Sequence, residues 1–199
     1  MSERIGKKGD DRHEIYDFDG DGMVLLSGGV DSSACLALLK NQGINLSCLF
    51  INYGHSAAKR EYSAASAIAN FYGVPLRQIT VSGFQQWGAG FVPGRNAFLL
   101  HTALMAATFQ KGMIAIGIHA GTSYRDCSSY FLKQMQCSFD VYTDGRISIS
   151  APFLDWTKRE IWEYCLQERL PLELTYSCEA GHEHMCGQCL SCVDRGLLV

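Results

Sequence analysis

A short glycine-bearing segment that follows an apolar run constrains this chain more than any other feature. Met23-Val24-Leu25-Leu26 leads directly into Ser27-Gly28-Gly29-Val30-Asp31-Ser32. The apolar run predicts a short buried strand, and the residues from Ser32 onward predict the start of a helix. Glycines let the backbone approach a ligand closely, and the first N–H groups of a helix have no partner within it. The segment therefore predicts an anion cradle suited to pyrophosphate.

Two common nucleotide-binding motifs do not fit this segment. A Walker loop requires G-x-x-x-x-G-K-[ST], and the chain has no Gly-Lys followed by Ser or Thr. The nearest match to a dinucleotide fingerprint is Gly88-Ala89-Gly90-Phe91-Val92-Pro93, which has proline where the third glycine belongs. The alternative to an anion cradle is an ordinary Gly-Gly turn before a helix, which binds no ligand.

Composition narrows the class of protein. A chain of 199 residues with 47% hydrophobic residues can bury one full core, with room for a small appendage. Its net charge of −3 argues against broad electrostatic binding to nucleic acid. No apolar run reaches the roughly 18 residues of a membrane span, and the first residues lack the apolar region of a signal peptide. Nine cysteines without such a signal indicate the cytoplasm, where clustered cysteines more often bind metal than form disulfides.

Apolar strands alternate with helical segments after a polar extension over residues 1–20. We expect strands at 23–26, 46–52, 76–81, 113–118 and 147–150. We expect helices at 32–41, 57–71, 96–110, 126–137 and 157–168, the last opened by a capping box from Thr157 to Glu160. This order predicts an α/β domain over residues 21–172, built on an open parallel sheet covered by helices on both faces. Ligands of such sheets bind outside the carboxyl ends of the strands.

Four cysteines near the end of the sequence have metal-binding spacing. Cys178, Cys186, Cys189 and Cys192 form C-x7-C-x2-C-x2-C within 15 residues. Cys-x2-Cys spacing lets two thiolates reach one ion, and four sulfurs suit tetrahedral Zn²⁺, so we expect a closed structural site in the segment 173–199. Replacement of one cysteine by His182 or His184 stays open, as does an iron–sulfur cluster. Four of the five other cysteines are expected to be small buried residues.

Three further polar groups follow the expected strands. Arg95 and Asn96 end the segment Val92-Pro93-Gly94-Arg95-Asn96, where Asn96 would cap a helix and the Arg95 guanidinium could face a phosphate. Asp126 could cap the next helix or hold a substrate amine or ring N–H. Lys158 lies in the first turn of a helix, where a cation is slightly unfavourable, which favours an anionic partner over solvent.

Taken together, these segments resemble the 7-cyano-7-deazaguanine synthase (QueC-like) family of the ATP-pyrophosphatase (PP-loop) group, whose fold is adenine nucleotide alpha hydrolase-like. The resemblance runs in family order over residues 23 to 196. It is carried by Ser27-Gly28-Gly29-Val30-Asp31-Ser32, Asn52-Tyr53-Gly54, Val92-Pro93-Gly94-Arg95-Asn96, Tyr124-Arg125-Asp126-Cys127, Ala151-Pro152 with Lys158, and Ser177-Cys178 through Cys186-Gly187-Gln188-Cys189-Leu190-Ser191-Cys192 with Arg195. The combination is far more specific than any one segment.

The resemblance implies a ligase reaction. The carboxylate of 7-carboxy-7-deazaguanine would attack the α-phosphorus of Mg-ATP, ammonia would displace AMP to give an amide, and a second ATP would convert the amide to a nitrile. Implied ATP contacts are Leu26, Ser27, Gly28, Gly29, Val30, Asp31, Ser32, Ser33, Tyr53, Gly94 and Arg95. Implied catalytic residues are Ser27, Asp31, Ser32, Arg95 and Lys158, and implied substrate contacts are Asn96, Tyr124, Asp126 and Cys127. The chemistry needs no side-chain nucleophile, so Cys127 is expected only to line the pocket.

The sequence also departs from the family pattern. About a dozen residues connect the third strand to Pro93-Gly94-Arg95-Asn96, where the family has a longer insertion. Tyr53-Gly54-His55-Ser56-Ala57 and Asp126-Cys127-Ser128 replace the family's Tyr-Gly-Gln-Arg-His and Asp-Cys-Arg. These changes would open the substrate side and remove positive charge from it. Short relatives of the family occur in antiphage defence operons, so an amine of a partner protein is an alternative acceptor to ammonia.

Other functions compete with this interpretation. Another pyrophosphatase reaction, such as tRNA thiolation, NAD amidation or argininosuccinate-type ligation, is disfavoured by the cysteine spacing and the Pro-Gly-Arg-Asn turn. A nucleotide-binding module without turnover and a zinc-ribbon interaction protein are the alternatives from other classes. The sequence leaves the oligomeric state open, a homodimer included.

Overall fold

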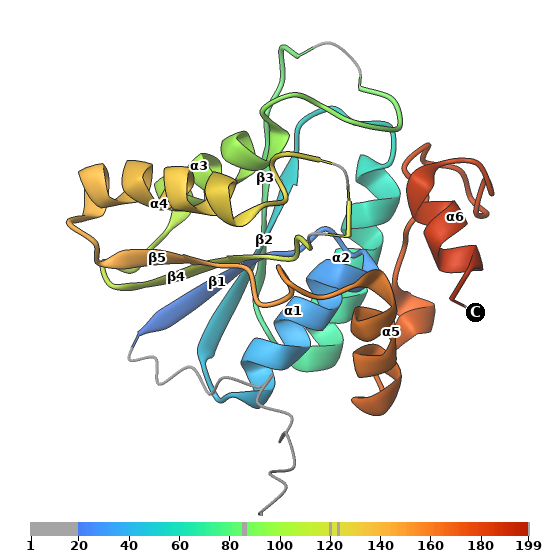
Figure 1. The fold of residues 1–199 in the computed structure, drawn as a ribbon, viewed down its shortest axis with the longest axis horizontal. Coiled ribbons are helices and arrows are strands. Elements are labelled where there is room, and N and C mark those ends of the chain that lie inside the picture. The colour runs from blue at the N-terminus through green and yellow to red at the C-terminus, as the bar shows by residue number, and fades with distance from the viewer. Residues whose placement is uncertain (1–19, 85–86, 120, 123, 199) are drawn as a thin grey trace, which may run out of the picture.

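The computed structural model describes residues 20–84, 87–119, 121–122 and 124–198, and within them five strands form one parallel sheet. The strand order is β3-β2-β1-β4-β5 (Figure 1). The strands are β1 (Asp21–Leu25), β2 (Asn45–Asn52), β3 (Leu76–Thr80), β4 (Gly112–Ile116) and β5 (Ile147–Ser150). The open parallel sheet expected from the sequence is thus confirmed. The expected polar extension lies outside the described residues, apart from Gly20.

Helices cover both faces of the sheet, as predicted. The helices are α1 (Val30–Asn41), α2 (Ala58–Tyr72), α3 (Arg95–Ala106), α4 (Ser129–Thr143), α5 (Lys158–Gln167) and α6 (Leu190–Gly196), with a 3-10 turn at Leu172–Leu174. Helices α1, α2 and α5 pack against one face, and α3 and α4 pack against the other (Figure 1). None of the described helices is long and apolar enough to cross a membrane.

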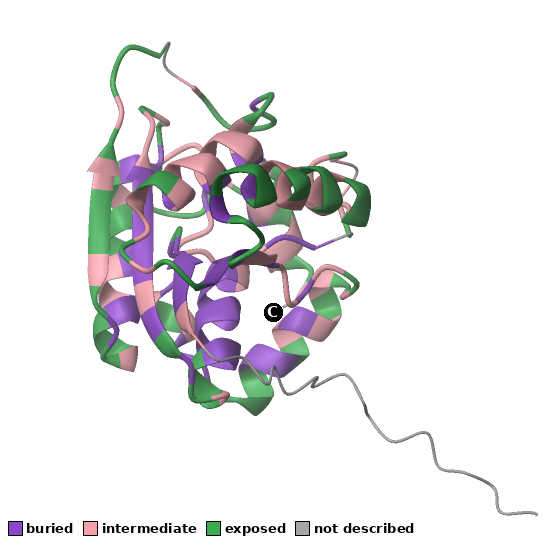
Figure 2. Cartoon of the chain, turned by 90° about the vertical axis from the view of Figure 1, so that its left-hand side faces the viewer, coloured by how far each residue is buried: buried purple, intermediate pink, exposed green. Residues whose placement is uncertain are grey.

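Two hydrophobic clusters, one on each face, hold the sheet between its helices. Side chains alternate across a strand, so Val24 of β1 packs under α1 and α5 while Met23 and Leu25 pack under α3 and α4. Every residue of β4 is buried, as expected for a central strand covered on both sides. In Figure 2 the inner strands are coloured as buried, and the exposed residues gather on the outer faces of the helices.

The structure corrects two predicted helix caps. Helix α3 begins at Arg95 after Gly94, so Asn96 lies inside the helix and does not cap it. Helix α4 begins at Ser129, and its cap is Ser128, whose Oγ accepts the Phe131 N–H at 3.2 Å, so Asp126 does not cap it either. In both places the expected capping residue lies within three residues of the true helix start. Ser128 has the extended backbone typical of an N-cap, whereas α3 follows Gly94 in the left-handed region with no side-chain cap.

Helix lengths also differ from the expectations. Helix α3 ends at Ala106, four residues before the expected end at Gln110, and the backbone turns extended at Ala107. Helix α4 continues beyond Cys137 to Thr143, because Phe139 carries its apolar face further into the core. The capping box of α5 is confirmed, with Thr157 accepting the Glu160 N–H and the Glu160 carboxylate accepting the Thr157 N–H.

Candidate functional site

The candidate site is a cavity where the direction of the sheet connections changes. From β1 the chain continues through α1 to β2 on one side, whereas β4 lies on the other side of β1 and leads to β5. The loops after β1 and β4 therefore diverge, and a crevice opens at the carboxyl ends of these two strands. A cavity of about 290 Å³ occupies it, lined by both loops, by the ends of β2 and α3, and by the residues around α6.

Hydroxyl groups hold the loop after β1 in shape. The Ser32 Oγ accepts the Ser27 N–H at 3.2 Å and donates to the Gly29 carbonyl at 3.1 Å. The Ser27 Oγ lies 3.0 Å from the Ser32 Oγ and accepts the Gly29 N–H at 3.3 Å. The Ser33 Oγ also donates to the Gly29 carbonyl, at 2.8 Å. These bonds fix the turn at the N-terminus of α1, the end of a helix that favours anions.

Glycines let this loop fit between two other parts of the backbone. Gly28 has a φ of 81°, and a Cβ there would lie 2.6 Å from the Ala65 nitrogen and 2.6 Å from the Glu61 carbonyl oxygen in α2. Across the cavity, a Cβ on Gly117 after β4 would lie 2.8 Å from the backbone of Asp31. The loop is therefore in backbone contact on both sides, and neither position has room for a larger residue.

An ion pair lies in the cavity beside this loop. The Lys158 Nζ contacts both carboxylate oxygens of Asp31 at 2.5 Å, and both side chains are about three-quarters buried. The anionic partner that the position of Lys158 favoured is, in this structure, the Asp31 carboxylate. Because α5 begins at Lys158 while α1 begins one residue before Asp31, this contact joins the two helix starts at the cavity.

His119 adds a neutral ring to the same group. Its Nδ1 accepts the Gly121 N–H at 3.2 Å, which leaves the ring proton on Nε2, 4.0 Å from the Asp31 Oδ2. Burial lowers the pKa of His119, and the positive charge of Lys158 lowers it further, whereas the negative charge of Asp31 acts in the opposite direction. The ring is therefore a neutral donor at neutral pH.

A row of side chains crosses the cavity from α3 to α2. Arg95 at the start of α3 lies close enough to Tyr53 for its charge to act on the hydroxyl, and the Tyr53 ring stacks on His55 with centroids 4.2 Å apart. The His55 Nε2 lies 2.9 Å from the Glu61 Oε2. Burial raises the pKa of Tyr53, and the Arg95 charge opposes that rise. All four residues line the cavity.

Sequence reasoning did not assign His55 or Glu61 to the site. A signal was present, because Tyr53, Gly54 and His55 follow β2, the neighbour of β1, at the edge where ligands bind. Glu61 gave no signal of its own, since an acidic residue in the first turn of a helix is common, and its contact with His55 is a tertiary detail.

Three of the four residues expected to contact the substrate line the cavity, and one does not. Asn96, Tyr124 and Cys127 line it, and Tyr124 stacks on Phe91 with centroids 5.2 Å apart. Asp126 is absent from the lining, and its backbone carbonyl accepts the Asn96 Nδ2–H at 3.2 Å. Burial raises the pKa of Cys127, so its thiol stays protonated at neutral pH, as suits a lining residue.

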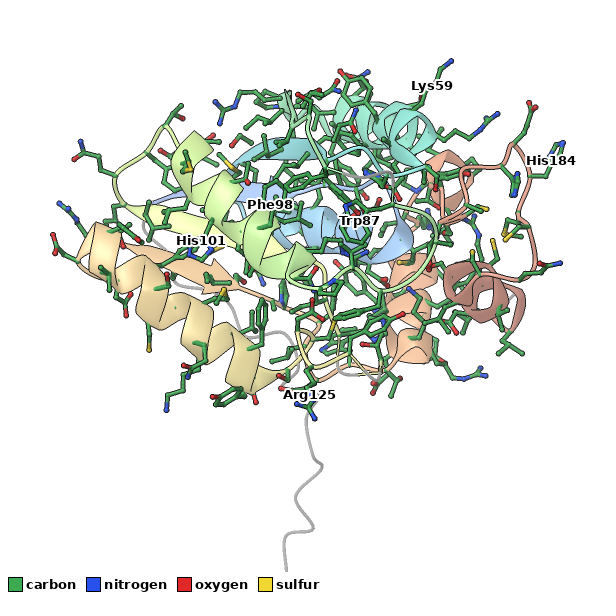
Figure 3. The ribbon with its side chains drawn as sticks, turned by 90° about the horizontal axis from the view of Figure 1, so that it is seen from above. Lys59, Trp87, Phe98, His101, Arg125 and His184 are labelled. Atoms are coloured by element: carbon green, nitrogen blue, oxygen red, sulfur yellow. The ribbon has the colours of Figure 1, made fainter. Side chains whose placement is uncertain are left out.

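Most of the residues expected to contact ATP or to act in catalysis line the cavity. Leu26, Ser27, Gly29, Val30, Asp31, Ser32, Tyr53, Arg95 and Lys158 line the cavity, whereas Gly28, Ser33 and Gly94 do not. Gly94 has a φ of 77° and sets the turn into α3, so it positions its neighbour Arg95. Arg125 projects outward from the molecule (Figure 3).

The four expected metal ligands lie together. The sulfurs of Cys178, Cys186, Cys189 and Cys192 all lie within 4.8 Å of one another. Among the described residues this cluster contains no histidine, and His184 points away from the molecule (Figure 3). Four sulfurs at this separation fit one tetrahedral ion, so the cluster could hold a metal.

Backbone donors prepare one of these thiols for metal binding. Burial opposes ionisation of Cys178, but backbone N–H groups of Cys186, His182 and Ala180 outweigh it and lower its pKa to about 6. The thiolate is the form that binds metal. Of the remaining cysteines only Cys137 is exposed, and Cys35, Cys48, Cys127 and Cys165 are buried, which confirms the prediction.

Comparison with known proteins agrees with this arrangement. The family model described as queuosine biosynthesis protein QueC matches residues 21–90 and 86–197. The 7-cyano-7-deazaguanine synthase of Prochlorococcus marinus (strain MIT 9215) is 30% identical over 203 residues, covering 87% of this chain and 90% of that protein. The enzyme of the same name from Halobacterium salinarum is 30% identical over 204 residues, covering 87% and 88%. That from a Nitratiruptor species is 29% identical over 196 residues, covering 85% and 89%.

Proposed function

This chain belongs to the QueC family, and we propose that it is an ATP-dependent ligase that adenylates the carboxylate of 7-carboxy-7-deazaguanine. Ammonia then displaces AMP to give the amide, and a second ATP activates the amide oxygen so that loss of AMP leaves the nitrile. The observation that carries the proposal is the cavity at the carboxyl ends of β1 and β4, whose floor is the Ser27–Ser32 loop at the N-terminus of α1.

The loop and the cations around it suit release of pyrophosphate. The free N–H groups at the start of α1 are donors for phosphate oxygens, and the hydroxyls of Ser27 and Ser32 hold the loop that presents them. Arg95 and Lys158 line the same cavity and would stabilise charge that develops on the leaving group. Asp31 supplies a carboxylate that could hold the Mg²⁺ that accompanies ATP, and Mg²⁺ would neutralise phosphate charge there.

The remaining wall suits a flat purine-like acid. Tyr124, Asn96 and Cys127 line it, and the Tyr124 ring is stacked on Phe91. Catalysis would rest on positioning the carboxylate against the α-phosphorus and on charge stabilisation, with no covalent enzyme intermediate. The four-cysteine cluster holds a structural Zn²⁺ in this proposal and takes no part in the chemistry.

A second acceptor is favoured by one observation. The connection from β3 to α3 spans residues 81–94; its Gly90 lines the cavity, and its Phe91 is half exposed. A wider mouth admits a larger nucleophile than ammonia, so an amine of a partner protein is the alternative acceptor of the activated acid. Members of the family in antiphage defence operons would use such an acceptor.

One experiment separates these reactions. The protein is incubated with ATP and 7-carboxy-7-deazaguanine, with and without ammonia, and all small products and proteins are weighed by mass spectrometry. We expect AMP, pyrophosphate and the amide or nitrile when ammonia is present. A mass added to a candidate partner protein without ammonia would favour the alternative acceptor.

The control is the Ser27→Ala variant, which should keep its fold and lose AMP formation. Nucleotide bound without any AMP formed by the wild-type protein would refute the ligase and leave a binding module.

A further inference from the structure

Glu179 joins the four-cysteine segment to the cavity. It follows Cys178 directly, and it lines the cavity that contains the loop after β1. Its Oε2 accepts the Gly90 N–H at 3.0 Å, and its Oε1 accepts the Ser191 Oγ–H at 2.6 Å and the Ser191 N–H at 3.3 Å. Its backbone carbonyl accepts the Ser56 Oγ–H at 2.9 Å. One residue therefore contacts three segments that are distant in sequence.

The contact with Gly90 reaches the substrate side of the cavity. Gly90 has a φ of 107° and belongs to the connection between β3 and α3. The next residue is Phe91, which stacks on Tyr124, and Arg95 follows at the start of α3. Residues 88–91 are largely exposed, so core packing does little to hold this part of the connection in place.

The side chain of Glu179 accepts its hydrogen bonds through a carboxylate, which is a strong acceptor. N–H and O–H groups that donate to an ionised carboxylate form bonds roughly twice as strong as those between neutral groups. The neighbouring backbone is held as well, because a Cβ on Gly181 would lie 2.5 Å from the Ser56 carbonyl oxygen. Close backbone contact thus fixes the segment that presents the carboxylate.

We propose that Glu179 is a positioning residue that transmits the folded state of the four-cysteine segment to the substrate wall of the cavity. It does so by holding the backbone at Gly90, and with it the place of Phe91 against Tyr124. The identity of the molecule that this wall receives rests on the proposed function, whereas the restraint on Gly90 does not.

The first test measures the restraint without any substrate. Amide hydrogen exchange at Gly90, followed by NMR, should be on the order of tenfold faster in Glu179→Gln, because the neutral amide is a weaker acceptor than the carboxylate. The matched control is Glu183→Gln in the same segment, whose carboxylate is 74% exposed and lies 3.8 Å from the Arg60 Nη2. That control should leave exchange at Gly90 unchanged, and both variants should retain the wild-type metal content by elemental analysis.

The second test uses the reaction. Glu179→Gln should raise KM for the acid about tenfold, while KM for ATP and kcat change by less than about threefold. Removing the metal with a chelator should also speed exchange at Gly90 in the wild-type protein. Equal exchange at Gly90 in Glu179→Gln and Glu183→Gln would overturn the proposal, as would unchanged exchange after metal removal. If the wild-type protein forms no AMP, the proposed function fails, and the exchange measurements still decide the role of Glu179.

Discussion

Replacing Gly28 by alanine would test whether the loop after β1 needs its backbone contact with α2. Alanine at a φ of 81° enters the left-handed region, which costs about 1–2 kcal/mol. Its Cβ would lie 2.6 Å from the Ala65 nitrogen and the Glu61 oxygen, and overpacking of this kind costs about 1–3 kcal/mol. We therefore expect the free energy of unfolding to fall by about 2–5 kcal/mol. In a domain of this size that lowers Tm by about 4–20 °C.

Gly29 provides the matched control in the same loop. A Cβ there would lie 3.4 Å from the Ser27 Oγ, an acceptable contact, and its φ of −76° suits any residue. Thermal unfolding of Gly28→Ala and Gly29→Ala should therefore differ, with the second within about 0.5 kcal/mol of wild type. Nucleotide binding, measured by calorimetry, should also weaken in Gly28→Ala because the cradle must shift. A Gly28→Ala protein that unfolds within 2 °C (roughly 0.5–1 kcal/mol) of wild type would refute the reasoning.

Three other changes test the rest of the site. Cys189→Ala should lose zinc and destabilise the segment by several kcal/mol, since metal binding there contributes folding energy; wild-type protein without zinc by elemental analysis would contradict this. Under the proposed function, Lys158→Gln should lower kcat/KM for AMP formation by roughly 100-fold, because the cation proposed to stabilise the leaving phosphate is lost and the Asp31 carboxylate loses its ion-pair partner. Burial lowers the pKa of His119 in the folded protein, so on acidification the unfolded chain takes up a proton at this histidine before the folded protein does. The free energy of unfolding should therefore fall as the pH drops below about 6.5, the pKa of histidine in an unfolded chain. Denaturation curves of His119→Gln should lack that part of the pH dependence, and an unchanged slope would exclude His119 as its source.

The sheet was predictable because β1 and β4 contain continuous apolar runs, over residues 23–25 and 113–116. β1 and β4 are buried on both faces, so their sequences contain uninterrupted apolar runs that short-range reasoning finds. The ends of the helices were harder to predict from the sequence. Asn96 has a good capping side chain, but its amide contacts the backbone of Asp126, 30 residues away, and α3 starts at Arg95 instead.

In the candidate site, too, some residues could be predicted from the sequence and others could not. The loop after β1 is a local motif, so its residues and their shared position could be predicted from one stretch of sequence. Glu179 could not, because its partner Gly90 lies 89 residues away and an isolated glutamate carries no pattern. The pairing of His55 with Glu61 spans only six residues, yet its place in the cavity depends on the stacking of Tyr53. The sequence therefore predicts residues that act through a local turn and misses those that act through tertiary contacts.

The glycine after β4 has a consequence for how this molecule can change over evolution. Gly117 brings two main chains into close contact at Asp31, so a shift of the loop after β1 would require the backbone after β4 to shift with it. At the opposite rim, the contact between Gly90 and Glu179 depends on a side chain and not on two main chains in contact. Substitutions that admit a new nucleophile or a bulkier acid are therefore expected at this rim. If the proposed function holds, related proteins could change their acceptor at this rim while the loop after β1 stays the same.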